Sequence, residues 1–138
     1  MYLIDTNVIS EIRKGRKANR GVRKFFRKTL YKRFDLYLSV ITVGELSRGV
    51  ELIRHRGDIR QAALLEDWLS GLLRDYADHI LPFDTDMAQV WGKLRSPHSE
   101  HLLDKQIAAT ALVYDLTVLT RNTRDFEATG VRILNPFE

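Results

Sequence analysis

The sequence contains no cysteine, so it can form no disulfide and offers no thiolate ligand to a metal. It has no run of about 18 apolar residues, which predicts that no segment spans a membrane. The first seven residues, MYLIDTN, lack the basic and long apolar regions of a secretory signal, so we expect an intracellular, cytoplasmic protein. Neither a Gly-rich phosphate loop nor a Gly-x-Ser-x-Gly motif is present.

Acidic residues are missing from one stretch of the chain. Residues 13–33 carry 11 lysines and arginines and no aspartate or glutamate, whereas the whole chain has a net charge of only +4. The rest of the protein is therefore acidic. A basic segment beside an acidic remainder indicates that one part holds an anionic polymer and another part acts on it, although a solvated basic surface is the simpler alternative.

The length of 138 residues predicts one domain with a proper hydrophobic core. Short apolar runs predict strands at residues 1–4, 36–41, 79–81, 117–120 and 131–134. Helical spacing predicts helices at about 8–12, 22–32, 42–54, 59–76, 85–94 and 104–115, with a basic loop at 13–21 and a polar loop at 121–125. Alternating strands and helices predict an α/β fold with a parallel sheet covered on both faces.

Four carboxylates occupy related places in this pattern. Asp5 and Asp125 follow expected strands, and Glu45 and Asp104 lie near the starts of expected helices. In a right-handed α/β sheet these places share one edge, so the four carboxylates would repel one another unless a cation joins them. Oxygen ligands without cysteine favour Mg²⁺ or Mn²⁺, and such an ion can activate water and stabilise charge on a phosphodiester.

Each carboxylate also has a purely structural interpretation. Glu45 completes Thr42-x-x-Glu45, the pattern of a capping box at a helix start. Asp104 suits the first turn of a helix, where the dipole favours negative charge. Asp5 and Asp125 could each serve a turn. It is the joint placement of the four that points to a metal site.

Four segments resemble those of one known family: Tyr2–Asn7 (YLIDTN), Ser39–Leu46 (SVITVGEL), Leu103–Ala111 (LDKQIAATA) and Thr120–Phe126 (TRNTRDF). In this order they resemble the PIN-domain ribonucleases, and within them the VapC toxins of bacterial toxin–antitoxin pairs. The resemblance covers nearly the whole chain. It implies a PIN-like three-layer fold, with a central parallel sheet flanked by helices, and a single nuclease domain over residues 1–138.

The resemblance also implies an activity: a metal-dependent endoribonuclease that cleaves RNA with metal-activated water. Carried over residue by residue, it assigns Mg²⁺ or Mn²⁺ binding to Asp5, Asp104 and Asp125, and metal ligation or orientation of the attacking water to Glu45. The matching supporting polar positions are Thr6, Asn7, Thr120 and Asn122. The implied partners are a second copy of the chain, in a homodimer, and a small inhibitory antitoxin.

The basic stretch at residues 13–33 departs from the family pattern, so its role is not carried over from the resemblance. We predict that it contacts RNA phosphates, because no acidic residue interrupts it. The residues concerned are Arg23, Lys24, Arg27 and Lys28.

Three alternatives remain open. The protein could be a non-enzymatic nucleic-acid-binding module whose acids only cap helices, which a chelator experiment distinguishes. It could be a phosphoacceptor receiver domain, but the expected strand at 117–120 is followed by Arg121 and Arg124 rather than by a lysine. Finally, His98 and His101 lie three residues apart and could share a helical face for metal-free acid–base cleavage of RNA.

Overall fold

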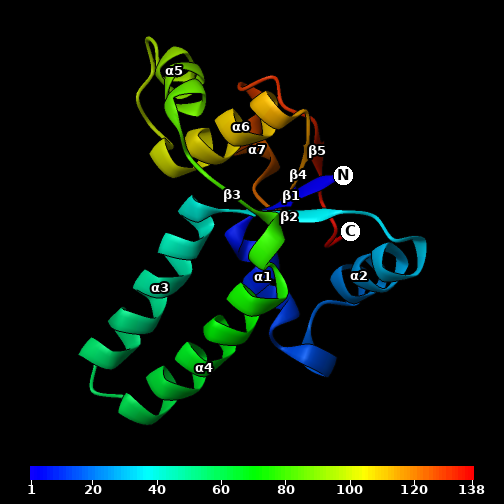
Figure 1. The fold of residues 1–138 in the computed structure, drawn as a ribbon, viewed down its shortest axis with the longest axis vertical. Coiled ribbons are helices and arrows are strands. Elements are labelled where there is room, and N and C mark those ends of the chain that lie inside the picture. The colour runs from blue at the N-terminus through cyan, green and yellow to red at the C-terminus, as the bar shows by residue number, and fades with distance from the viewer.

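A computed structural model describes all 138 residues and places five parallel strands in one central sheet (Figure 1). The strand order is β3-β2-β1-β4-β5, so the first strand of the chain lies in the middle. The strands are β1 (Tyr2–Ile4), β2 (Leu36–Ser39), β3 (Ile80–Leu81), β4 (Thr117–Leu119) and β5 (Ile133–Leu134).

Helices connect the strands and cover both faces of the sheet. They are α1 (Thr6–Ile12), α2 (Arg20–Lys32), α3 (Val40–His55), α4 (Ile59–Asp75), α5 (Thr85–Leu94), α6 (Leu102–Tyr114) and α7 (Thr123–Glu127), with 3₁₀ turns η1 (Gly15–Lys17) and η2 (Ala77–His79). The predicted α/β class and parallel sheet are therefore confirmed. None of these helices combines the length and the apolar character needed to cross a bilayer.

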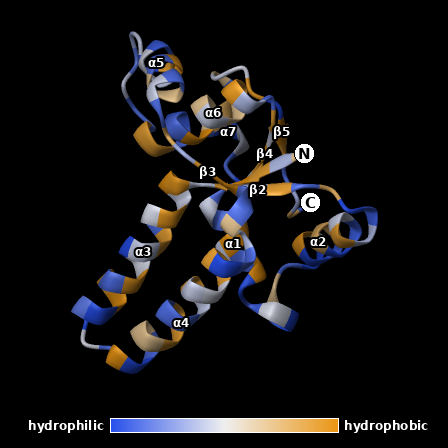
Figure 2. Cartoon of the chain, viewed as in Figure 1, coloured by the Kyte–Doolittle hydropathy of each residue, from blue (hydrophilic) through white to orange (hydrophobic).

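Two apolar clusters, one on each face of the sheet, hold the three layers together. Ile4 and Leu119 point to the cluster formed with α1, α2, α3 and α4, whereas Leu3 and Val118 point to the cluster formed with α6 and α7. Successive strand residues alternate between faces, so each short strand contributes to both clusters. All four side chains are fully buried, and each contributes about 1.5–3 kcal/mol relative to an exposed position. Figure 2 shows β2 in the colour of hydrophobic residues.

The connection between β2 and α3 differs from the prediction. The strand ends at Ser39 and the helix begins at Val40, because the Ser39 hydroxyl accepts a hydrogen bond from the Ile41 amide at 3.0 Å and caps the helix. The capping box predicted for Thr42 and Glu45 is therefore absent, since both residues lie inside α3. Glu45 is not needed to cap the helix and is available for other interactions.

Two predicted loops contain helical structure. The segment at residues 13–21 includes η1, and α2 begins at Arg20 because the Asn19 side chain accepts hydrogen bonds from the amides of Gly21 and Val22 at 2.8 and 3.2 Å. The polar segment that follows β4 enters α7 at Thr123. In both places a short polar sequence predicts a loop, but local caps and turns start a helix within it.

Candidate metal centre

Asp5 is fixed at the carboxyl end of β1 by a set of hydrogen bonds. Its backbone amide donates to the Leu119 carbonyl at 2.9 Å, which ties it to β4. One carboxylate oxygen, Oδ1, accepts from the Thr6 amide at 2.8 Å. The other, Oδ2, accepts from the Thr120 hydroxyl at 2.8 Å and from the Asn7 side-chain amide at 3.2 Å. These hydrogen bonds hold the Asp5 side chain in one orientation and satisfy the carboxylate of a residue that is only 3% exposed.

A further ring of polar contacts orients the groups around Asp5. The Asn7 side chain donates to the Thr120 hydroxyl oxygen at 3.3 Å and accepts from the Arg121 amide at 3.1 Å. The Asn122 amide donates to the same Thr120 oxygen at 3.0 Å. Of the predicted supporting residues, Asn7 and Thr120 thus lie around Asp5 through their side chains, and Thr6 and Asn122 through their backbone amides.

Glu45, on the second turn of α3, lies beside Asp5. Its Oε1 accepts a hydrogen bond from the Thr6 hydroxyl at 2.8 Å. Burial raises the pKa of the Glu45 carboxyl, the Thr6 hydrogen bond opposes this shift, and the negative charge of Asp5 adds to it. Burial likewise raises the pKa of Asp5, against the effect of its hydrogen bonds.

The other two carboxylates come from the opposite side of the sheet. Asp104 is on the first turn of α6 and Asp125 is on α7. Burial, followed by the charges of Asp5, Asp125 and Glu45, raises the pKa of Asp104 from its usual value near 3.8 to about 6. All four predicted carboxylates therefore lie within electrostatic reach of one another at the carboxyl edge of the sheet.

This donor set fits a hard divalent cation. The four carboxylates belong to four different elements, and their mutual repulsion is what a bound dication would offset. Carboxylate oxygens are the ligands that Mg²⁺ and Mn²⁺ take in proteins. The structure thus contains an acidic cluster that can bind a divalent metal.

His101 is a member of this cluster that sequence analysis did not place there. One ligand atom from each of His101, Asp104 and Asp125 lies within 4.8 Å of the others. The alternative in which His98 and His101 share a helical face is not found, since both precede α6, and the His98 carbonyl accepts a hydrogen bond from the Lys105 ammonium at 2.7 Å. The sequence feature that could have indicated this role is the position of His101 three residues before Asp104.

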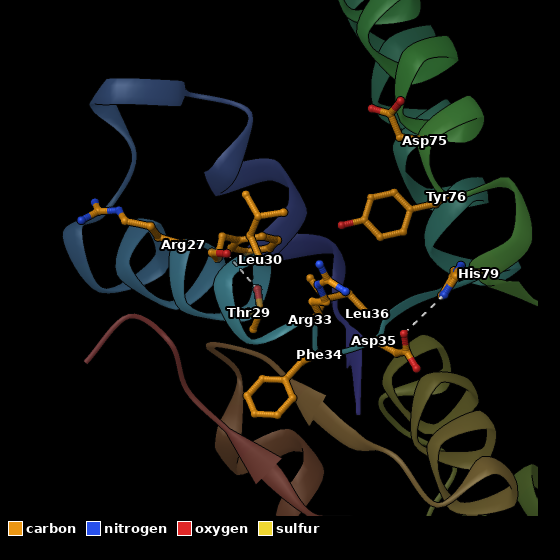
Figure 3. A pocket seen from close by; sticks show the side chains of 11 residues that line it. Arg27, Thr29, Leu30, Arg33, Phe34, Asp35, Leu36, Asp75, Tyr76 and His79 are labelled. Carbon is orange, nitrogen blue, oxygen red and sulfur yellow. Dashed lines mark hydrogen bonds and ion pairs between the residues drawn. The ribbon is translucent and has the colours of Figure 1, made fainter.

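A cavity of about 600 Å³ lies away from the carboxylates, between the end of α2, the start of β2 and the end of α4 (Figure 3). Asp35 and His79 face each other across one side of it, with 3.8 Å between His79 Nε2 and Asp35 Oδ1. Asp35 precedes the first residue of β2, so this cavity is at the amino edge of the sheet. None of the four clustered carboxylates lines it.

Comparisons with known proteins agree with the fold. The PIN domain family matches residues 2–131. The toxin FitB of Neisseria gonorrhoeae is 38% identical over 99% of each chain, and a VapC ribonuclease of Sinorhizobium fredii is 35% identical over 100% of this chain and 99% of its own.

Solved structures give the same result. The crystal structure of FitAcB from Neisseria gonorrhoeae superimposes with a TM-score of 0.86 at 37% identity, over 100% of this chain and 99% of that chain. A toxin–antitoxin complex from Klebsiella pneumoniae superimposes with a TM-score of 0.62 at 25% identity, over 100% of this chain and 99% of that chain. The sheet, the acidic edge and these matches lead to one conclusion: the chain belongs to the PIN-domain family, among relatives that include VapC-type toxins.

Proposed function

We propose that this protein is a metal-dependent endoribonuclease of the toxin–antitoxin type. The observation that carries the proposal is the convergence of Asp5, Glu45, Asp104 and Asp125 on one edge of the parallel sheet, where burial and then the charges of the other three raise the pKa of Asp104. Relatives that match the full length of the chain are named as a toxin and as a ribonuclease, which supports the same activity.

The four carboxylates have two different proposed roles. Asp5, Asp104 and Asp125 would hold Mg²⁺ or Mn²⁺, which supplies activation of water and stabilisation of charge on the phosphodiester. Glu45 has Oε1 engaged by Thr6, and its Oε2 receives no hydrogen bond from the protein. Because burial raises its pKa, Glu45 Oε2 is suited to orient the attacking water and to accept its proton.

The polar residues around Asp5 keep this arrangement fixed before RNA arrives. Thr120 and Asn7 both donate to Asp5 Oδ2, and the Arg121 and Asn122 amides hold Asn7 and Thr120 in turn. A carboxylate locked in this way does not have to reorganise when substrate binds, which favours catalysis.

The activity is tested by incubating the purified chain with a mixed RNA in Mn²⁺ or Mg²⁺ buffer, and then in the same buffer with excess EDTA. We expect internal cleavage in the presence of either ion and its loss with EDTA. Undiminished cleavage in EDTA would contradict the metal mechanism. Binding of RNA without any cleavage would instead support a non-enzymatic binding module.

We propose that bound RNA extends from the carboxylates to the basic helix α2. The Arg121 amide donates to Asn7, and the Arg121 guanidinium lies 3.9 Å from the ring centroid of Phe137. Phe137 borders a hollow of about 590 Å³ whose other lining residues are mostly basic. These are Asn19, Arg20, Gly21, Arg23, Lys24, Arg27 and Glu138.

The four predicted RNA-binding residues differ in how they relate to this hollow. Arg23, Lys24 and Arg27 line it, whereas Lys28 lines a neighbouring hollow of about 290 Å³ that it shares with Lys24. The hollow next to Arg121 therefore supports phosphate contacts by the first three more strongly than by Lys28. Figure 2 shows hydrophilic and hydrophobic residues on α2, consistent with one side facing the core and another facing solvent.

We predict that replacing Arg23, Lys24, Arg27 and Lys28 together by glutamine weakens RNA binding and reduces its dependence on salt. Each phosphate contact that is lost lowers the slope of log affinity against log salt by roughly 0.7 for single-stranded RNA. Fluorescence anisotropy with a labelled RNA at several salt concentrations measures the slope, in EDTA so that cleavage does not interfere.

The matched control replaces four exposed basic residues outside α2, namely Arg56, Arg60, Arg74 and Lys93, so that net charge falls by the same amount. Its salt slope is expected to stay close to that of the wild type. If the α2 variant also keeps the wild-type slope, or if the two variants fall equally, the α2 residues make no specific phosphate contact.

We further propose a cognate antitoxin and a homodimer as partners. A solved toxin–antitoxin complex shares the fold, and the clustered carboxylates would attract an arginine or lysine of an inhibitor. Leu112, Val113 and Tyr114 leave apolar surface exposed at the end of α6, which a second copy could cover. The test is to express the chain from its native operon and purify it. A fully active monomer without a bound protein would contradict both the antitoxin and the homodimer.

A further inference from the structure

The side chain of His101 is directed at the carboxylates instead of capping the helix that it precedes. His101 is the N-cap residue of α6, in the left-handed conformation with φ 58° and ψ 49°, and its side chain makes no capping hydrogen bond. Its Nδ1 lies 3.8 Å from Asp125 Oδ1, which is too far for a hydrogen bond. The imidazole therefore sits beside two carboxylates without a hydrogen bond to any protein group.

The spacing of the three ligand atoms fits a shared ion. An ion bonded to nitrogen and oxygen at roughly 2.0–2.2 Å holds its ligand atoms up to about 4.4 Å apart. The atoms of His101, Asp104 and Asp125 all lie within 4.8 Å of one another, so small side-chain rotations bring them to a common ion. His101 is exposed, so its ring is free to turn about its own bonds.

We propose that His101 is a nitrogen ligand of the metal held by Asp104 and Asp125, and that this centre therefore prefers a divalent transition ion such as Mn²⁺ over Mg²⁺. The inference rests on the proposed function and specifies its cofactor. Mg²⁺ is bound in proteins through oxygen and water, whereas transition ions also accept imidazole. One histidine added to a carboxylate cluster is thus a means of selecting the ion.

The direct test is pulsed electron paramagnetic resonance of Mn²⁺ bound to the full chain, which detects ¹⁴N nuclei bonded to the ion. We expect ¹⁴N modulation in the wild type and its loss in His101→Asn. Asparagine is chosen because it tolerates the left-handed backbone of this position. The matched control, His98→Asn, removes a nearby histidine outside the cluster and should keep the ¹⁴N signal.

Competition between the two ions gives a second readout. Calorimetric titration of the wild type with Mn²⁺ and Mg²⁺ should show tighter binding of Mn²⁺, and His101→Asn should reduce the Mn²⁺-to-Mg²⁺ ratio by about tenfold or more. Far-ultraviolet circular dichroism verifies that the variants fold.

Two outcomes would overturn the inference, and they are distinguishable. If Mn²⁺ binds, and binding is lost in Asp5→Asn, but the wild type shows no ¹⁴N modulation, His101 is not a ligand while the proposed nuclease centre stands. If Mn²⁺ does not bind to the wild type at all, the metal centre of the proposed function fails together with the role of His101.

Discussion

The Asp5→Asn chain is expected to cleave RNA at least about a thousandfold more slowly than the wild type in the same Mn²⁺ buffer, because metal binding and stabilisation of the transition-state charge are lost together. Asparagine keeps an oxygen for the Thr6 amide but removes the negative charge. Its amide group would also face the Asn7 amide, so one of the two side chains must turn. Rates of cleavage of a labelled RNA give the measurement.

The control for this prediction is Asp86→Asn, which removes the same charge from an exposed first turn of α5. It should cleave RNA at the wild-type rate. Asp5→Asn activity within a few-fold of the wild type, with the same loss in EDTA, would show that Asp5 does not hold the metal.

Without metal, the Asp104→Asn chain should melt at the same or a higher temperature than the wild type at pH 7.5. The pKa of Asp104 is raised to about 6 in the folded protein, above its usual value near 3.8. The folded state thus binds more protons than the unfolded state between these values, and the stability of the metal-free wild type falls as pH rises through that window. Asparagine does not titrate, so the variant lacks this loss.

Adding metal should reverse the order. With free ion at about ten times its dissociation constant, linkage stabilises the wild type by roughly 1.4 kcal/mol, which is on the order of 5 °C for a domain of this size. Melting curves of both chains in EDTA and in Mn²⁺, at pH 5 and pH 7.5, measure these effects. If Asp104 only complements the dipole of α6, the variant should instead melt lower in every buffer.

The central features of the fold could be predicted because they depend on local patterns. β1 and β4 are short apolar runs directly followed by Asp5 and Thr120, and a parallel sheet places such ends on one edge. The position of Asp104 on the first turn of α6 followed from helical spacing. Periodicity and the handedness of the connections were thus enough to predict the elements that carry three of the four carboxylates. The fourth, Asp125, was predicted to lie in a loop but lies on α7.

Other features could not be predicted because they depend on single caps and on backbone conformation. The sequence at Ser39 is compatible with a strand that continues to Ile41, and only the hydrogen bond that the Ile41 amide donates to the Ser39 hydroxyl shows where α3 starts. The direction of His101 depends on a left-handed backbone, which non-glycine residues seldom adopt. No periodicity in the sequence encodes either choice.

The central position of β1 has a consequence for when activity first appears during synthesis. Asp5 is made almost at once, but its partner Thr120 is 115 positions further along the chain, and β1 lacks its neighbour β4 until then. Contacts between such distant residues form late in folding, and a chain leaves the ribosome at about 5–20 residues per second from its amino end. The nascent protein therefore carries its acidic residues apart for most of translation. A nuclease built in this way acquires its chemistry only when it is nearly finished, which delays the proposed attack on RNA until the chain is almost free of the ribosome that made it.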